Sequence, residues 1–315
     1  MKKERKSKKG KEPVKRKLTE AERARLMKRK KIINMIVMIV VIIGIGFIVY
    51  PIISNRYYTI KTNYTIKDYD DTVKKISKEE INRRMKLAHA YNAAIYSGTE
   101  SVPSFKDPYS DEEKREGIAE YARMLEVHEK IGHVEIPEIN IDLPIFAGTS
   151  PQVLQMGVGH MESSSLPVGG KNTHSILTGH RGLPKARLFT DLNRMQIGDT
   201  FYINNLGGKL AYEVDQIKVI EPSRFEDLRI VQGKDYVTLL TCTPYMINSH
   251  RLLVRGHRVP YNPAKEKEEK NKGLKLLIMK ISIGVLIIAI LLLIRRRKKK
   301  KKKKKQEEEN SKNQN

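Results

Sequence analysis

Two long apolar runs stand near the ends of the chain and separate two tails from a central region. The first run covers residues 32–53 without a charge, and as a helix of about 33 Å it is long enough to cross a bilayer. The second lies within residues 274–294 and contains Lys280, about one turn from its end, where a long side chain reaches the interface. We therefore expect two transmembrane helices. For the second run, a buried core helix followed by a solvated tail is the alternative.

The central region begins with helical spacing. Apolar residues recur every three or four positions after a capping box at Ser77–Glu80, and a second capping box at Ser110–Glu113 opens another helix. A loop rich in Gly, Ser and Pro, at about residues 98–110, separates the two helices. The pattern predicts a helical N-terminal extension over residues 54–130.

From Gly132 onward the spacing becomes that of strands. Short alternating runs are separated by turns rich in Gly, Pro, Asn and Asp, and no helices alternate with them as a parallel layered sheet would require. The runs are HVEIPEINIDLPIFAG, THSILTGH, DTFYINN, LAYEVDQIKVIEP, DYVTLLTC and RLLVRGHRV. We predict a mainly β domain over residues 131–262, built as a closed or nearly closed barrel, and a linker at residues 263–273.

The positive charge of the chain is concentrated in its tails. Residues 1–31 carry 16 lysines and arginines against four glutamates, and residues 295–315 carry 12 against three. The region between them is close to neutral, so a basic nucleic-acid-binding face is poorly supported. Because cytoplasmic flanks of membrane helices are rich in Lys and Arg, we expect a two-pass cell-membrane protein with both tails cytoplasmic and the central domain extracellular.

Cys242 is the only cysteine in 315 residues, so the fold does not rest on internal disulfides. It ends the run DYVTLLTC, in which Tyr236, Thr238, Leu240 and Cys242 share one face, and Pro244 cannot continue the ladder. A thiol at a strand end is more accessible than one in the middle of a strand. The alternative is a small apolar side chain in the core.

Candidate partners for a reactive thiol stand at two other strand ends. If RLLVRGHRV pairs with the preceding strand as a hairpin, Arg251 and Cys242 lie at the same end, where a guanidinium would stabilise a thiolate and an oxyanion. Arg255 on the same face is the competing candidate, and an exposed strand arginine is the simpler role for Arg251. Among eight histidines, His180 ends the run SILTGH between two glycines, although spacing alone does not establish that it is close to Cys242.

Three motifs resemble those of a known family. TLLTC, TGHRGLP and RLLVRGHR are similar to the nucleophile, histidine and arginine motifs of the sortases, which implies a closed sortase-type β-barrel of about eight strands over residues 131–262. The preceding helices, the second apolar run and the DPY at residues 107–109 resemble class C sortases, the pilin polymerases. The lid of that class usually carries Trp or Phe where this chain has Tyr109.

The resemblance implies a cysteine transpeptidase that cleaves LPxTG-type sorting signals through a thioacyl intermediate. Cys242 is then the nucleophile, His180 the general acid and base, and Arg251 the group that orients the signal and stabilises the oxyanion. The implied partners are pilin proteins with sorting signals and acceptor lysines, and the implied chemistry requires no cofactor and no metal.

The resemblance also implies a lid over the active site. Pro108 stiffens the DPY segment, so Asp107 would pair with Arg251 while the Tyr109 ring covers Cys242. An ordinary turn before the next helix is the alternative. Two other functions stay open: a housekeeping sortase that attaches proteins to cell-wall precursor, and a non-enzymatic two-pass membrane protein whose barrel binds a partner.

Overall fold

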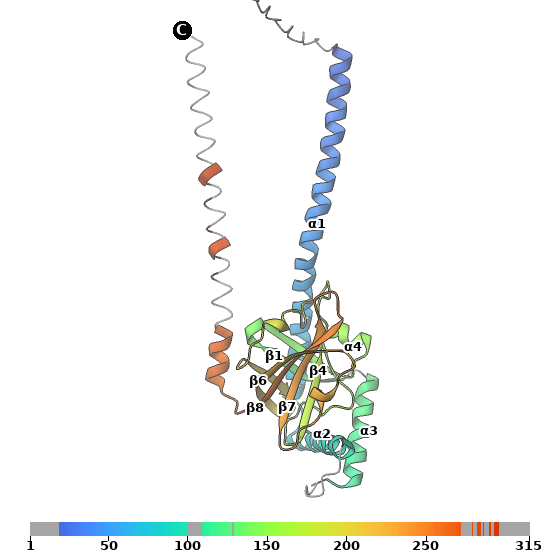
Figure 1. Ribbon diagram of the computed structural model, residues 1–315, viewed down its shortest axis with the longest axis vertical. Coiled ribbons are helices and arrows are strands. Elements are labelled where there is room, and N and C mark those ends of the chain that lie inside the picture. Colours follow the sequence, from blue (N-terminus) through green and yellow to red (C-terminus); the bar gives the residue numbers. More distant parts are fainter. Residues whose placement is uncertain are drawn as a thin grey trace, which may run out of the picture. The chain divides into compact units, whose positions relative to one another are not determined.

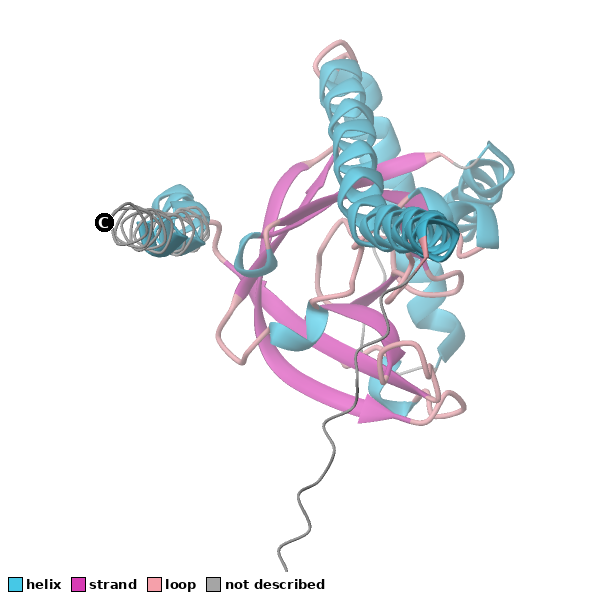
Figure 2. Cartoon of the chain, turned by 90° about the horizontal axis from the view of Figure 1, so that it is seen from above, coloured by secondary structure: helices cyan, strands magenta, loops and turns pink. Residues whose placement is uncertain are grey.

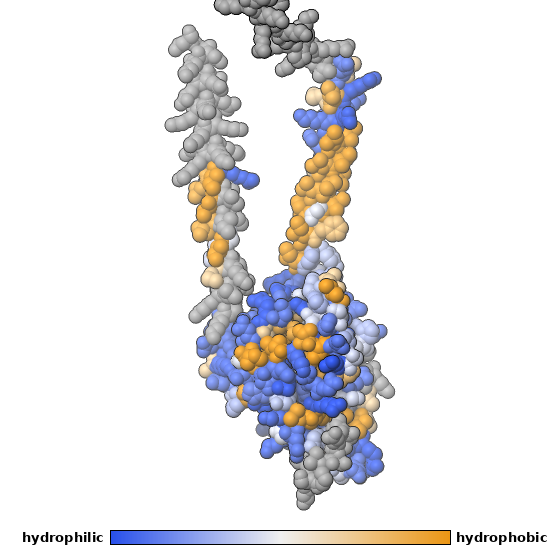
Figure 3. Space-filling model, in the orientation of Figure 1, coloured by the Kyte–Doolittle hydropathy of each residue, from blue (hydrophilic) through white to orange (hydrophobic). Residues whose placement is uncertain are grey.

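The computed structural model describes residues 19–99, 109–127, 129–271, 279, 282–284, 286, 290 and 293–295. The chain divides into two compact units, Met1–Ser54 and Asn55–Asn315, and helix α1 (Glu20–Val73) has residues in both. In the described residues, α1 is the one helix long and apolar enough to cross a membrane, and an 18-residue stretch of it has a mean hydropathy of 3.1 (Figure 3). The second apolar run lies mostly outside the described residues, so the second transmembrane helix stays a prediction.

Eight strands close a barrel in the order β1-β2-β3-β4-β7-β8-β6-β5 (Figures 1 and 2). The strands are β1 (Lys130–Ile136), β2 (Ile141–Ala147), β3 (Val158–His160), β4 (Thr173–Thr178), β5 (Thr200–Asn205), β6 (Gly208–Ile220), β7 (Asp235–Thr243) and β8 (His250–Val259). The predicted closed barrel of about eight strands is confirmed. Strand β3 is absent from the predicted runs because three residues are too few to show an alternating pattern.

Strand alternation divides the side chains of β7 and β8 between two faces. Val237 and Leu239 point into the barrel and join its buried core, together with the residues of β8 that pair beside them. Leu240 and Leu253 point outward and belong to a second buried cluster on the outer face of the sheet. Cys242 shares the face of Leu240, so the thiol lies outside the barrel rather than in its core.

The helical extension consists of the last part of α1 and two further helices, α2 (Lys78–Thr99) and α3 (Asp111–Val127). The predicted capping box forms in full at Ser110–Glu113, whereas at Ser77–Glu80 only the serine half forms and the Glu80 carboxylate pairs with Arg83 and Arg84. Ser77 Oγ accepts a hydrogen bond from Glu80 N at 3.2 Å, and Ser110 Oγ accepts one from Glu113 N at 3.2 Å. The Glu113 carboxylate accepts in return from Ser110 N at 2.8 Å, which satisfies a second free donor at the start of α3.

A buried histidine joins α3 to the barrel. Tyr121 of α3 donates its hydroxyl to His160 Nδ1 at 2.7 Å, and His160 Nε2 donates to Ser165 O at 2.9 Å. These two bonds require the neutral ring, and complete burial lowers the pKa of His160 to about 4.

Shorter helices complete the second unit: α4 (Pro151–Met156) and the 3-10 helices η1 (Pro137–Ile139), η2 (Leu192–Arg194) and η3 (Glu226–Leu228). Residues 263–271, within the predicted linker, are helical. Their buried Glu266 carboxylate accepts from the ammonium groups of Lys209 and Lys270, each at 2.7 Å. These contacts hold the first part of the linker against the barrel.

Lowering the pH from 7 to 5 is expected to lower the unfolding temperature. Burial holds the pKa of His160 and of His174 at about 4 in the folded chain, below the value of about 6.5 in the unfolded chain. Their contribution to stability is therefore present above pH 6.5 and is lost as the pH falls towards 4. At pH 5 the loss is on the order of 2 kcal/mol for each histidine.

Thermal unfolding followed by circular dichroism at each pH measures this effect. The control variant His160→Gln lacks one of the two titrating groups, so its unfolding temperature should depend less steeply on pH. An unfolding temperature that stays constant between pH 7 and 5 in the native chain would contradict the prediction.

Candidate active site

The β7–β8 hairpin brings Cys242 and Arg251 together. Their Cα atoms are direct partners in the antiparallel ladder, so the predicted hairpin, with both residues at the same end, is confirmed. Strand β7 ends one residue later, before Pro244, which has no N–H to donate to the ladder. Cys242 is half-buried, so its thiol is not enclosed as that of a core cysteine would be.

Strand β4 brings His180 to the same end. β4 runs parallel to β7, and beyond its last residue Gly179 N donates to Leu240 O at 3.1 Å, while the Thr241 hydroxyl donates to Gly179 O at 2.7 Å. If the pairing of β4 with β7 continues in the same register beyond Gly179, His180 lies directly across from Cys242. The His180 side chain is half-buried, and the loss of solvent lowers its pKa below the usual value of 6.5.

The two candidate arginines of β8 have different partners. Arg251 donates from one guanidinium nitrogen to the carbonyl oxygens of Asn248 and His250, each at 3.1 Å. These are single bonds to exposed backbone, which a substrate carbonyl can replace. Arg255 instead makes two parallel bonds to Asp215, at 2.9 and 3.2 Å, and lies too far along the strand to sit beside Cys242.

A third arginine, to which the sequence motifs assigned no role, connects the two strand ends. Arg181, next to His180, donates to the Thr243 hydroxyl at 2.8 Å and to Thr190 O at 3.2 Å. The Thr190 hydroxyl accepts in turn from Gly182 N at 3.3 Å. The loop that carries His180 is thus closed on itself and bonded to the residue that follows the nucleophile candidate. The sequence feature that could have indicated a role for Arg181 is its position directly after His180 in the TGHRGLP motif.

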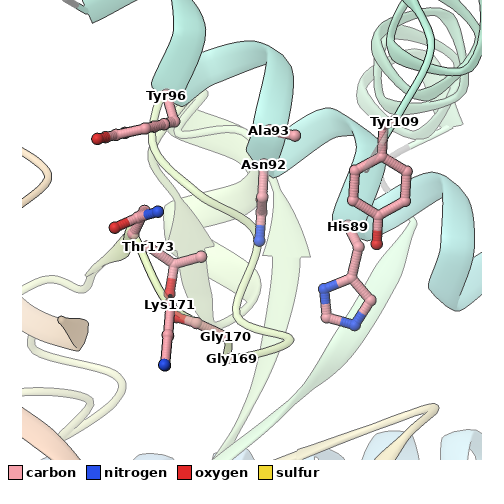
Figure 4. A pocket seen from close by; sticks show the side chains of 10 residues that line it. His89, Asn92, Ala93, Tyr96, Tyr109, Gly169, Gly170, Lys171 and Thr173 are labelled. Carbon is pink, nitrogen blue, oxygen red and sulfur yellow. Dashed lines mark hydrogen bonds between the residues drawn. The ribbon is translucent and has the colours of Figure 1, made fainter. Parts of the chain in front are cut away.

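Of the predicted lid residues, Asp107 and Pro108 lie outside the described residues. Tyr109 lines a pocket of about 250 Å³ together with His89 of α2 and residues 169–173 (Figure 4). In Figure 4 the Tyr109 and His89 rings lie near one another on one side of this pocket.

This pocket is at the end of the barrel opposite to the thiol. Thr173, which lines it, pairs with Asp235 at the start of β7. Cys242 is seven residues farther along that strand, about 23 Å away at 3.3 Å per residue. The structure therefore does not place the Tyr109 ring over the thiol, in contrast to the prediction. The reason is that Tyr109 directly precedes the N-cap of α3, which packs against α2 and holds it near that helix.

The outer face between these two ends contains a second buried histidine. His174 bonds to the Thr238 hydroxyl at 2.7 Å and to Arg229 O at 2.9 Å, and burial lowers its pKa to about 4. It is a structural ring far from Cys242. Within the residues that the structure describes, no three His, Cys, Asp or Glu side chains are grouped as metal ligands.

Comparison with known proteins agrees with this geometry. Residues 134–259 match the family description "Sortase domain". A curated relative, sortase A of Streptococcus agalactiae, is 25% identical over 66% of this chain and 77% of its own length. The crystal structure of Streptococcus agalactiae sortase C1 is 60% identical, with a TM-score of 0.58 over 62% of this chain and 100% of that chain.

Sortase C-1 from Streptococcus pneumoniae is similar as well. It is 56% identical, with a TM-score of 0.54 over 63% of this chain and 100% of that chain. At this identity and coverage the likeness extends beyond the fold to the family and its class. This chain belongs to the sortase family of cysteine transpeptidases, in class C.

Proposed function

We propose that this chain is a membrane-anchored sortase that cleaves LPxTG-type sorting signals and joins pilin subunits through lysine isopeptide bonds. The observation that carries the proposal is the meeting of three groups at one end of the outer barrel face: the chain's only cysteine, Cys242, with Arg251 opposite it and His180 level with it. The high identity to structures named sortase C1 favours pilin assembly over a housekeeping role.

A buried apolar cluster lies beneath the approach to the thiol. Ile176, Leu240, Leu253 and Ile220 form it on the outer face of β4, β7, β8 and β6, and Met161 and Leu228 pack against it. Leu240 is two residues before Cys242 and on the same face, so an extended peptide that lies over this face towards the end of β7 reaches the sulfur. The leucine and proline of a sorting signal would then contact the residues that cover the cluster.

The chemistry follows from the placement of the three groups. Because its pKa is lowered, His180 is mainly neutral at pH 7 and takes the proton of the Cys242 thiol. The thiolate attacks the threonine carbonyl carbon, and Arg251 leaves its loop carbonyls to stabilise the oxyanion. The protonated His180 then gives its proton to the departing glycine amine as the C–N bond breaks, which leaves a thioacyl enzyme.

The second half of the reaction reverses these roles. A lysine amine of another pilin subunit loses a proton to His180 and attacks the thioacyl carbon. The C–S bond breaks, an isopeptide bond forms, and Cys242 leaves as a thiolate that recovers the proton from His180. The acceptor lysine must reach the sulfur from the side that the sorting signal does not occupy.

Anchoring completes the proposal. The apolar residues 32–53 of α1 would hold the enzyme in the cell membrane, and the second apolar run at residues 274–294 would add another span. The basic tails on the outer flanks of both runs support an orientation with both ends in the cytoplasm and the barrel outside, where secreted pilins would emerge.

Cys242→Ala is expected to abolish both cleavage of an LPxTG peptide and formation of the thioacyl enzyme. Without the nucleophile the rate should fall on the order of 10⁴-fold or more, as seen for other enzymes with covalent intermediates. Mass spectrometry of peptide and enzyme measures both steps. The unfolding temperature should change little, because one half-buried sulfur at a strand end is removed. Cleavage near the native rate would remove Cys242 from the mechanism.

Arg251→Lys is expected to lower the rate of thioacyl formation by on the order of 10²-fold, because an ammonium lacks the fork of donors that a guanidinium offers. Arg255→Lys is the matched control on the same face. It loses the paired bonds to Asp215 and should lower stability more than rate. If the Arg255 variant is inactive and the Arg251 variant active, the assignment of the two arginines is reversed.

Arg181→Lys and Thr243→Val are each expected to lower kcat by about tenfold while KM changes little, because each breaks the bond that aligns the histidine loop with the thiol. The double variant should be no slower than either single one, since both remove the same contact. Arg187→Lys, an exposed arginine of the same loop paired with Asp191, is the control and should keep native kcat. Multiplied losses in the double variant would contradict a shared contact.

A further inference from the structure

The loop between β7 and β8 exposes three consecutive large apolar side chains. Tyr245, Met246 and Ile247 are 52%, 64% and 70% exposed, and they follow Cys242 within five residues. In contact with water alone, three exposed apolar side chains at a loop tip contribute no stability to the fold. The side chains are therefore candidates for contact with an apolar or interfacial partner.

The chain itself limits how far this end of the barrel can be from the membrane. Tyr58 of α1 donates its hydroxyl to Met156 O of α4 at 2.7 Å, and its ring packs against the barrel core. Tyr58 is the fifth residue after Ile53, the last residue of the apolar run, so the two are less than about 18 Å apart however the chain bends there.

The contacts of α4 show that Tyr58 is attached at the catalytic end. Strand β3, which begins two residues after α4, pairs its Gly159 with Thr178 at the end of β4. Lys185 of the histidine loop donates to Gln155 of α4 at 3.0 Å. Figure 1 shows α4 away from α2, which lies where β7 begins.

The histidine loop in turn touches the apolar triplet. A Cβ atom on Gly182 would lie 3.1 Å from the Tyr245 ring and 3.2 Å from the Met246 sulfur. With φ of +85° this glycine also holds a conformation that other residues rarely adopt. The attachment of α1, the histidine loop and the exposed triplet therefore belong to one end of the barrel.

The charge of this end complements a lipid surface. Residues 180–191 and 244–251 together contain four arginines and lysines and one acidic residue, Asp191, which pairs with Arg187. Cationic side chains next to exposed Tyr, Met and Ile are the combination that binds anionic headgroups while apolar groups enter the interface.

We propose that the segment Tyr245–Ile247 contacts the surface of the anionic bilayer in which the chain is anchored, so that the catalytic end of the barrel faces the membrane. This inference rests on the anchoring of residues 32–53 in the proposed function. Its consequence is that a substrate reaches Cys242 along the membrane surface, as an extended segment in the narrow space between barrel and lipid.

A single tryptophan tests the contact. The native chain contains none, so Ile247→Trp adds the only indole fluorophore. The full chain is placed in nanodiscs of phosphatidylglycerol and phosphatidylcholine, with and without bromine on the acyl chains. We expect the brominated lipid to quench this tryptophan by about twofold, as for an interfacial side chain. Met246→Trp provides a second variant at the same loop tip.

Val231→Trp is the matched control. Val231 is also exposed, at 43%, but it lies in the turn just before β7, at the other end of that strand from Cys242. It should show no quenching. Equal quenching at the two positions, or none at Ile247→Trp while the chain in nanodiscs still joins peptide to acceptor, would overturn the membrane contact and leave the proposed function intact.

Two further outcomes also decide the question. Fluorescence of Ile247→Trp that responds to an LPxTG peptide but not to brominated lipid would overturn the proposal and assign the triplet to the substrate. A chain that does not copurify with nanodiscs would overturn the anchoring and this inference together, whereas its peptide-joining activity, assayed separately, would still test the transpeptidase.

Discussion

The parallel pairing of β4 with β7 is the constraint on which the rest of the site depends. It joins segments more than sixty residues apart, and its last bonds, at Gly179, set His180 level with Cys242. A slip of one residue would turn Leu240 and Cys242 into the barrel and the core residues outward. The apolar core therefore fixes the face on which the thiol lies, because a one-residue slip would expose Val237 and Leu239.

Glycine at one position allows the histidine loop to close over the barrel. A Cβ atom on Gly179 would lie 2.8 Å from the Phe189 ring, closer than real contacts permit. Phe189 is fully buried, and its N–H donates to His180 O at 3.1 Å. The loop thus returns to its own start, so its core-facing residues stabilise the backbone that presents the imidazole.

The local parts of this arrangement could be predicted from the sequence, and the distant parts could not. Alternation and Pro244 predicted where β7 ends and how the hairpin aligns Arg251 with Cys242, because both strands are neighbours in the chain. The adjacency of His180 required a parallel pairing that no spacing reveals, and motif resemblance supplied it. Tyr109 lies away from its predicted place over the thiol because it closely precedes α3, and the packing of α3 on α2 is a tertiary contact that local sequence does not reveal.

Three side-chain hydrogen bonds link α1, just after its apolar residues, to the residue that follows the nucleophile: Tyr58 to Met156, Lys185 to Gln155, and Arg181 to Thr243. Each is worth only about 1 kcal/mol, too little to decide whether the barrel folds. These hydrogen bonds matter for orientation rather than for stability, because the barrel is rigid and each bond fixes one loop at its catalytic end. Stability therefore comes from the core of the barrel, whereas the orientation of the site towards its substrates depends on a few polar contacts outside it.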